Sequence, residues 1–143
     1  VPERFSSDLW IHEDHAYTGT WGNRGGRPGN AVKIWQLGSN GAPTLVDSII
    51  VNGIGTVSDI QVSDNGRLLV FSAEGPANAG LYVYRRTDPL KPTRVGFYPV
   101  EQGIHTVTVA RVGDKLYAFG ARNPVSPALL IFDLSAYDRE EAP

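Results

Sequence analysis

The 143-residue chain contains no cysteine, which excludes disulfide bonds, thiolate nucleophiles and cysteine-bound metal sites. None of its apolar segments approaches the ~18 residues that a transmembrane helix needs. The formal net charge of −2 gives no electrostatic reason to expect a nucleic acid as partner. The chain is therefore expected to fold as an ordinary globular protein with no transmembrane segment, and the lack of cysteine is compatible with an extracytoplasmic location.

Methionine is absent as well, and the chain begins Val1-Pro2 rather than with an initiator residue. We therefore expect a processed or partial chain.

Glycine and proline are plentiful, with 16 and 10 residues respectively, and they recur at roughly regular intervals. Such punctuation is typical of many short strands joined by turns, so the composition predicts an all-β protein.

Three segments of similar pattern recur along the chain, at offsets close to 50 residues. Each is an alternating strand, a tight polar turn, a second strand, a Gly/Pro/Asn-rich loop and a third strand. The opening strands begin Ser7-Asp8, Ser58-Asp59 and His105-Thr106. The first two segments add a fourth strand, at 44–51 and 94–100, whereas the third stops near 135–137 without one.

A four-stranded antiparallel unit that recurs every ~40–50 residues is the signature of a β-propeller blade. A run of hairpins in a β-sandwich is the alternative, but a sandwich gives no reason for the same order of strands and loops to recur in phase. We expect one partial propeller domain, 1–143, with blades at about 7–51, 56–100 and 103–137, the last lacking its outer strand. The alternating aromatics are expected to pack between blades: Trp10, Trp35, Tyr82, Tyr84 and Phe132.

The second unit carries a tail in which Leu81 and Val83 are followed by Asp88-Pro89, Pro92 and Val95-Gly96-x-Tyr98. This pattern resembles the LVIVD repeat. Residues 129–135 resemble the core of the same repeat, and 32–37 are a looser copy. The resemblance implies a bacterial or archaeal surface or secreted β-propeller. It describes how a strand ends, turns and pairs, and it transfers no catalytic residue.

Three blades are too few for a closed ring, because a propeller closes with at least four. The first and third blades would each expose a large apolar face, and such faces mark interaction surfaces. We expect the remaining blades to come from the same parent polypeptide or from other chains.

The inner strand of each blade lines the central channel of a propeller, so the beginnings of these strands are candidates for a site. Asp8, Asp59 and His105 are expected around one axis, where two carboxylates and an imidazole would suit a divalent cation. Oxygen ligands favour calcium, and the imidazole favours zinc or manganese. The alternative is structural, with each aspartate bonded to backbone N–H groups of the preceding turn.

The second candidate region is the face formed by the loops between the second and third strands. Its expected binding residues suit a small anionic or sugar ligand: Trp21, Arg24, Arg27, Glu74, Asn78, Arg122 and Asn123. The loop at 22–30, GNRGGRPGN, is either an anion grip or, by default, a mobile loop.

Other motifs are weaker. His12-Glu13-Asp14-His15 has the wrong spacing for a zinc-protease helix and is expected to be a solvated turn on the opposite face. No Gly-x-Ser-x-Gly elbow is present, which leaves an α/β-hydrolase serine without support.

The function expected from the sequence is a non-catalytic extracytoplasmic binding or scaffold module that presents its loop face to a partner or small ligand. The alternative is a metal-assisted hydrolase or lyase with its ion on the propeller axis.

Overall fold

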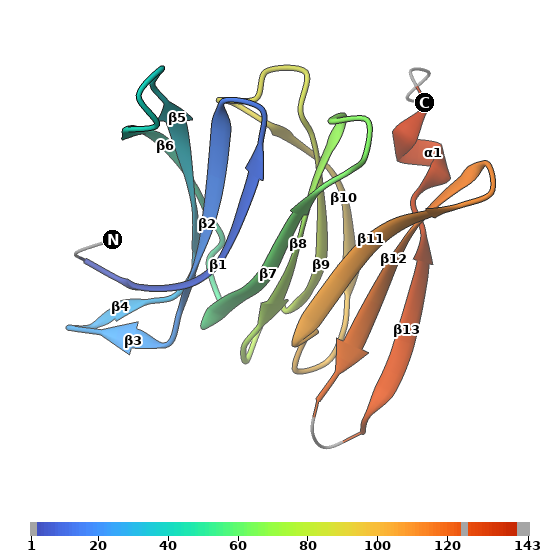
Figure 1. Cartoon of the computed structure of the whole chain (residues 1–143). Helices are drawn as coiled ribbons and strands as arrows, with labels where there is room; N and C mark the ends of the chain where they lie inside the picture. The colour runs from blue at the N-terminus through green and yellow to red at the C-terminus, as the bar shows by residue number, and fades with distance from the viewer. Residues whose placement is uncertain (1–2, 124–125, 140–143) are drawn as a thin grey trace.

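A computed structural model describes residues 3–123 and 126–139, and these fold into three antiparallel sheets that follow one another in chain order (Figure 1). The first sheet, blade 1, contains β1 (Phe5–His12), β2 (His15–Trp21), β5 (Ala31–Leu37) and β6 (Pro43–Ile50). The second, blade 2, contains β7 (Thr56–Val62), β8 (Leu68–Glu74), β9 (Gly80–Arg85) and β10 (Thr93–Pro99). The third, blade 3, contains β11 (Thr106–Val112), β12 (Lys115–Arg122) and β13 (Ala128–Asp133).

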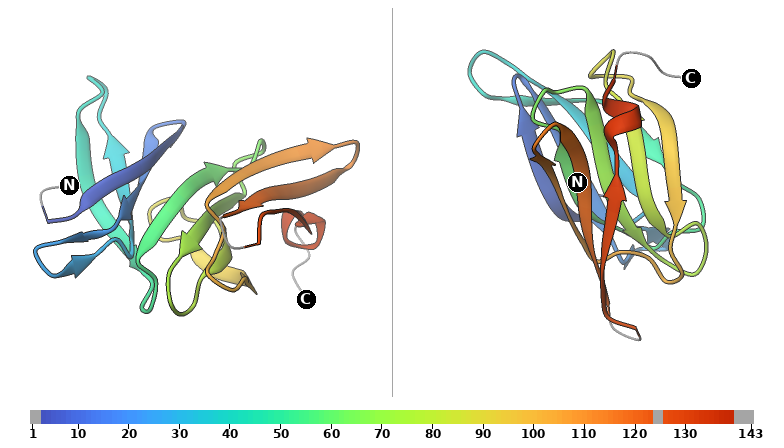
Figure 2. Two further views of the ribbon diagram at one scale, coloured as in Figure 1. Left: turned by 90° about the horizontal axis from the view of Figure 1, so that it is seen from below. Right: turned by 90° about the vertical axis from the view of Figure 1, so that its right-hand side faces the viewer.

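Each blade is a meander in which every strand pairs with its neighbour in sequence, apart from the small hairpin inserted between β2 and β5. That hairpin consists of β3 (Asn23–Arg24) and β4 (Arg27–Pro28). Blade 1 lies at one end of the row and blade 3 at the other, with blade 2 between them (Figure 2). Three successive sheets, each packed on the next, exclude the sandwich alternative and confirm the all-β, partial-propeller prediction.

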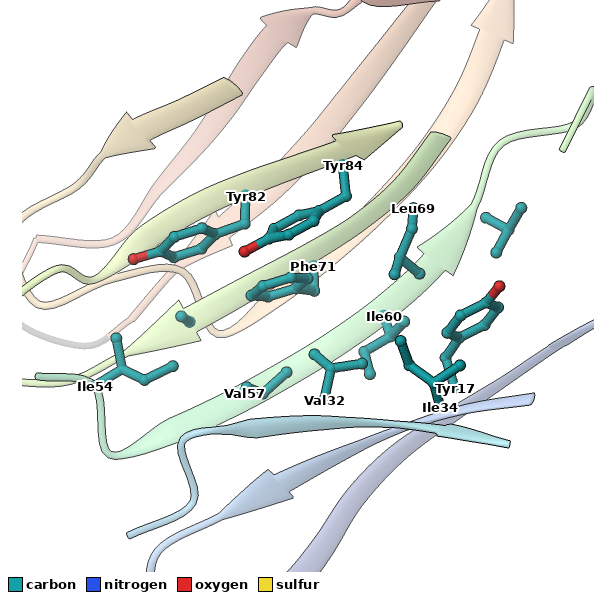
Figure 3. Close-up of a cluster of buried hydrophobic side chains, with 12 residues drawn as sticks. Tyr17, Val32, Ile34, Ile54, Val57, Ile60, Leu69, Phe71, Tyr82 and Tyr84 are labelled. Carbon is teal, nitrogen blue, oxygen red and sulfur yellow. The ribbon is translucent and has the colours of Figure 1, made fainter. Parts of the chain in front are cut away.

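Blade 2 lies between two blades and is buried on both faces. Because side chains alternate across a strand, each of its strands contributes residues to both cores. In β8, Phe71 and Leu69 point into the core that blade 2 shares with blade 1, whereas Leu68 and Val70 point into the core shared with blade 3. Figure 3 shows the first of these cores, in which Phe71 lies beside Tyr82 and Tyr84. The continuous apolar run in β8 thus follows from its central position.

After β13 the chain forms α1 (Ser135–Asp138), a single helical turn, at the point in the sequence where the other blades continue into a fourth strand. This turn is fastened to blade 2. The carbonyl oxygen of Tyr137 accepts a hydrogen bond from Nη2 of Arg85 at 2.8 Å, and the side chain of Asp138 accepts one from Asn65 at 2.7 Å. Among the described residues, the third sheet contains three strands.

The outward faces of blades 1 and 3 are apolar and uncovered by described residues. On blade 1 a hollow of about 310 Å³ is lined mainly by Leu9, Ile11 and Trp35, with smaller apolar neighbours. On blade 3 Leu129 is 66% exposed and Ile131 58% exposed. Trp35 therefore lies on the open face and donates its indole N–H to Thr18 at 3.0 Å, rather than packing between two described blades as expected.

Candidate functional site

The beginnings of β1, β7 and β11 and the end of β8 enclose a pocket of about 230 Å³. Its lining contains four residues that the sequence singles out as binding or metal-ligating candidates, and four small hydroxyl residues. The lining residues are Ser7, Trp21, Thr56, Ser58, Asp59, Glu74, His105 and Thr106. The inner strands therefore converge on one site, although they are about 50 positions apart in sequence.

Glu74 is the centre of the polar wall of this pocket. Its Oε2 accepts a hydrogen bond from the hydroxyl of Ser58 at 2.9 Å, and Nδ1 of His105 lies 3.2 Å from the same oxygen. The His105 side chain is 53% exposed, so its imidazole is open to solvent while it contacts the carboxylate. The pocket thus contains an acid and a base that are already partnered with each other.

Asp8 and Asp59 both bridge neighbouring blades. The backbone N–H of Ile60 donates to Oδ2 of Asp8 at 2.9 Å, and the N–H of Val107 donates to Oδ2 of Asp59 at 2.9 Å. The structural alternative named the preceding turn as the partner, and this is wrong. The aspartate carboxylate of one blade instead accepts a hydrogen bond from a backbone N–H in the inner strand of the next blade.

This pair of bonds also corrects the expected equivalence of His105. The N–H groups of Ile60 and Val107 donate equivalent bonds, so Val107 is equivalent to Ile60. By the same count, Thr106 of blade 3 is equivalent to Asp59, and His105 is equivalent to Ser58. The register of β1 shifts between Ser6 and Leu9 and that of β7 between Val57 and Ile60, whereas β11 pairs without a shift. The Ser-Asp pairs therefore lie at irregularities, or bulges, that blade 3 lacks.

The expected cation ligands are not gathered as tightly as a metal requires. Within the described ranges, a group of three or more candidate ligand atoms lying within 4.8 Å of one another occurs only at Glu13, Asp14 and His15. Asp8, Asp59 and His105 do not form such a group, because each carboxylate is directed at the following blade. A divalent cation at these three residues stays a prediction.

Asp59 lines this pocket with a carboxyl group whose pKa is displaced upward. Burial raises the pKa of Asp59, and the nearby negative charges of Asp8 and Glu74 raise it further. The N–H of Val107 and the imidazole of His105 oppose this rise. A carboxyl group with a displaced pKa in a cleft is a common feature of functional sites.

Asp59→Asn is expected to leave the protein at least as stable as the wild type at neutral pH. The folded protein binds the Asp59 proton more tightly than the unfolded chain does, so wild-type stability falls as pH rises from the ordinary pKa of 3.8 through the raised folded value. Asparagine removes that fall and keeps an oxygen for Val107. Chemical denaturation on both sides of this window measures the difference.

Asp59→Ala is the matched control, because it removes charge and acceptor together. It leaves the buried N–H of Val107 unpaired, which costs about 1–3 kcal/mol. Equal losses for the asparagine and alanine variants would contradict the inter-blade role of the side-chain oxygen.

The glycine-rich loop between β2 and β5 carries a short hairpin and contacts blade 2. It forms the β3–β4 hairpin, and the backbone N–H of Val57 donates to the carbonyl of Gly29 at 3.0 Å, which ties the loop to blade 2. The Arg24 guanidinium lies over the Phe5 ring at 5.2 Å, and the Trp21 ring lies 5.6 Å from the same ring. Phe5 thus supports both side chains from β1.

The remaining candidates of the loop face lie outside the pocket. Asn78 adopts a positive φ of 56° and donates its amide to the carbonyl of Asn52 at 2.9 Å, which is a turn-forming role. Arg122 lies 3.9 Å from Glu101. With Arg24, Arg27 and the exposed Asn123, these residues do not line the pocket, so Trp21 and Glu74 are the expected binding residues that the fold brings together.

The His12–His15 segment is the β1–β2 turn. Nδ1 of His15 lies 2.8 Å from Oδ1 of Asp14, whose other oxygen accepts a hydrogen bond from Gln36 at 2.8 Å. That bond from Gln36 lowers the pKa of Asp14. Glu13 and Asp14 are solvated as expected, but His15 is only 9% exposed.

The fold and the site together define a class: three adjacent β-propeller blades with a polar pocket where their inner strands begin. No family model matches the chain, and no curated protein does. Among solved structures, the chain is similar to a Bacteroides fragilis protein provisionally named a 6-phosphogluconolactonase, with a TM-score of 0.63 and 15% sequence identity. The match covers 91% of this chain and 39% of that one, so the chain spans about two fifths of that protein's length. At this identity the likeness shows the fold alone.

No helix among the described residues is long and apolar enough to cross a membrane.

Proposed function

We propose that the protein is a non-catalytic binding or scaffold module whose pocket, lined by Trp21, Glu74 and His105, receives a small polar ligand or partner group. The observation that carries this proposal is the combination of an exposed indole with polar groups already partnered in the protein. Trp21 is 51% exposed, which leaves its ring available for stacking. Glu74 is bonded to Ser58 and His105, which fixes the carboxylate in the pocket wall beside the imidazole, where both groups can bond to a polar ligand.

Sugars suit this wall, because an aromatic face stacks on their C–H groups while carboxylate and imidazole bond to their hydroxyls. Anionic ligands fit less well beside Glu74 and Asp59. The proposed ligand class is therefore a neutral saccharide, and the expected loop-face arginines take no direct part in holding it.

Titration with methyl glucoside is expected to shift the indole N–H resonance of Trp21 in a nitrogen–proton correlation spectrum. The resonances of Trp10 and Trp35 are internal controls, because neither residue lines the pocket. Trp21→Ala should abolish the response, and Trp35→Phe should not. A spectrum unchanged by millimolar saccharide would count against the saccharide ligand, and equal shifts of all three indoles would indicate a nonspecific solvent effect.

The open faces of blades 1 and 3 support a second part of the proposal, in which further blades complete the ring. Leu9 lies on the open face of blade 1, and Leu129 lies on the open face of blade 3. The opposite face of each of these blades packs against blade 2. Native mass spectrometry decides between the sources. Assembly of identical 15.5 kDa chains indicates copies of itself, a different added mass indicates another polypeptide, and a lone chain at all concentrations rejects completion in trans.

The LVIVD-like tail of blade 2 and an extracytoplasmic location remain parts of the same proposal. Asp88-Pro89 forms the expected break after β9, with the N–H of Leu90 bonded to the Asp88 side chain at 2.9 Å. Fractionation of cells producing the native protein tests the location, and recovery in the cytoplasm would refute it.

The second candidate is a metal-assisted hydrolase or lyase with its site in the same pocket. The raised pKa of Asp59 beside His105 supports it, as does the provisional lactonase name of the similar structure. A gluconolactone is the substrate to test, with and without a chelator. This candidate requires hydrolysis above background that both His105→Ala and Asp59→Asn abolish. Activity that survives both substitutions would place any such reaction elsewhere.

A further inference from the structure

A second pocket lies at the opposite end of blade 2, beside the turn that connects β7 to β8 and the residues that follow β9. Its volume is about 210 Å³. It is lined by Asn65, Gly66, Arg67, Arg85, Arg86 and Thr87. The saccharide pocket proposed above lies where β7 begins and β8 ends, so the two sites lie at opposite ends of the same strands.

Arg86 is an unusual residue in this lining because it is only 6% exposed. Its Nε donates to the hydroxyl of Tyr17 at 2.8 Å, and its Nη1 donates to the carbonyl of Gly66. The guanidinium carbon lies 5.5 Å from the centre of the Tyr17 ring. Its Nη2 is buried and has no hydrogen-bond acceptor among the described residues. An unpaired buried guanidinium edge is costly, so an acceptor is called for at this position.

Arg85 also has a buried nitrogen without a hydrogen-bond acceptor. Its Nη2 donates to the carbonyl of Tyr137 at 2.8 Å, but its Nε is buried with no acceptor in the described part of the chain. Neither Arg85 nor Arg86 forms an ion pair with any described carboxylate. The nearest acid of the helical turn, Asp138, is occupied, because its two oxygens accept from Asn65 at 2.7 Å and from Arg111 at 2.9 Å.

The pocket wall therefore combines three cationic side chains with two buried donors that lack acceptors. Nη1 of Arg67 donates a hydrogen bond to the carbonyl of Asp138 at 3.1 Å. The Arg67 guanidinium therefore lies at the exposed edge of the pocket, which Thr87 also lines. Guanidinium groups arranged around a small polar cavity are the usual partners of phosphate, sulfate and carboxylate oxygens.

We propose that this pocket binds a small oxyanion, with a phosphate group as the best match. The anion enters past Arg67 and Thr87, and small movements of the Arg85 and Arg86 side chains bring the buried Nε and Nη2 atoms within hydrogen-bond distance of it. It provides Arg85 and Arg86 with the negative charge that no described carboxylate supplies as an ion pair. The site is independent of the saccharide pocket, and its ligand is either inorganic phosphate or the phosphate of a larger molecule.

The test is a titration of the intact chain with sodium phosphate, and with sodium chloride at matched ionic strength. Arginine side-chain Nε–H resonances and the melting temperature are followed together. Phosphate is expected to move the Nε–H signals of Arg85 and Arg86 and to raise the melting temperature, since a ligand of the native state stabilises it. Chloride is expected to do neither at the same ionic strength.

Variants assign the effect to the pocket. Arg67→Gln and Arg85→Gln are each expected to weaken phosphate binding at least tenfold, while Arg27→Gln, on the exposed β3–β4 hairpin, is expected to change nothing. Arg86 is left intact because its bonds to Tyr17 and Gly66 also support the fold. A Trp21→Ala variant should bind phosphate normally, which separates this site from the saccharide pocket.

Comparison of inorganic phosphate with glucose 6-phosphate identifies the source of the anion. Tighter binding of the sugar phosphate indicates a phosphorylated metabolite, and equal or weaker binding indicates the free ion. Absence of any phosphate-specific shift, or equal binding by wild type and both pocket variants, would overturn the proposal and assign the acceptor of Arg86 to a buried water molecule.

Discussion

Phe71→Ala is expected to lower the free energy of unfolding by about 3–5 kcal/mol, because it removes a large side chain from a fully packed core. Phe71 is 0% exposed and lies between blades 1 and 2. Its ring stacks on Tyr82 at 4.9 Å and on Tyr84 at 5.5 Å. A protein of this size typically has a total stability of about 5–15 kcal/mol, so the variant is expected to unfold at much lower denaturant concentration. Equilibrium denaturation followed by circular dichroism measures the change.

Phe119→Ala is the matched control for this prediction. Phe119 lies on β12 in alternation with Leu116 and Ala118, which face blade 2, so Phe119 faces the open side of blade 3. Its ring contacts Tyr117 at 6.0 Å and remains partly exposed. Its loss is expected to cost about 1 kcal/mol in the isolated chain. Equal costs for the two phenylalanine variants would mean that another blade covers the open face in solution, or that the core is misassigned.

Gly103→Ala is expected to destabilise the protein by about 3 kcal/mol or more, because two effects combine. Gly103 has φ = 98°, which side chains rarely adopt. An added Cβ would also meet the backbone of Ala73 and Glu74 at less than contact distance. Gly103 forms an isolated antiparallel bridge with Glu74 and leads directly to His105. The substitution should therefore also move the imidazole of His105 away from the carboxylate of Glu74.

The control for Gly103 is Gly113, which lies in the β11–β12 turn with φ = 62° and has no heavy atom within 4 Å of an added Cβ. Gly113→Ala carries only the conformational cost, about 1–2 kcal/mol. Thermal unfolding of both variants, together with the response of the Trp21 indole to methyl glucoside, provides the measurement. If Gly103→Ala cost no more than Gly113→Ala, the close approach of the two backbones would be refuted.

The position of the pocket was partly predictable. The recurrence of Ser7-Asp8 and Ser58-Asp59 at similar places in the repeats indicates a site at the beginnings of the inner strands. The position of Trp21 beside the glycine-rich loop indicates an exposed aromatic residue. The partners of the aspartates were not predictable, since the hydrogen bond that the N–H of Val107 donates to Asp59 depends on how blade 3 is rotated against blade 2. The pairing register shifts in β1 and β7 but not in β11. The expected equivalence of His105 with Asp8 and Asp59 was therefore wrong.

Arg86 gave no sequence signal of its own. It follows a strand in a repeat-like tail, where a charged residue is ordinarily solvated. Its burial results from contact with Tyr17, 69 positions earlier in the chain, on the neighbouring blade. Trp35 is the converse case, because its alternation predicted burial and the blade that would cover it is not among those described.

The order of strands and the repeat were determined by the sequence itself. These features depend on local alternation and on turn residues such as Gly113, and both act within a few residues. Tertiary structure alone decided which side chains meet across blades, because those contacts join positions about 50 residues apart through the stacking of sheets. The pocket at the beginnings of the inner strands, the pairing of Glu74 with His105, and the contact of Arg86 with Tyr17 depend on that stacking.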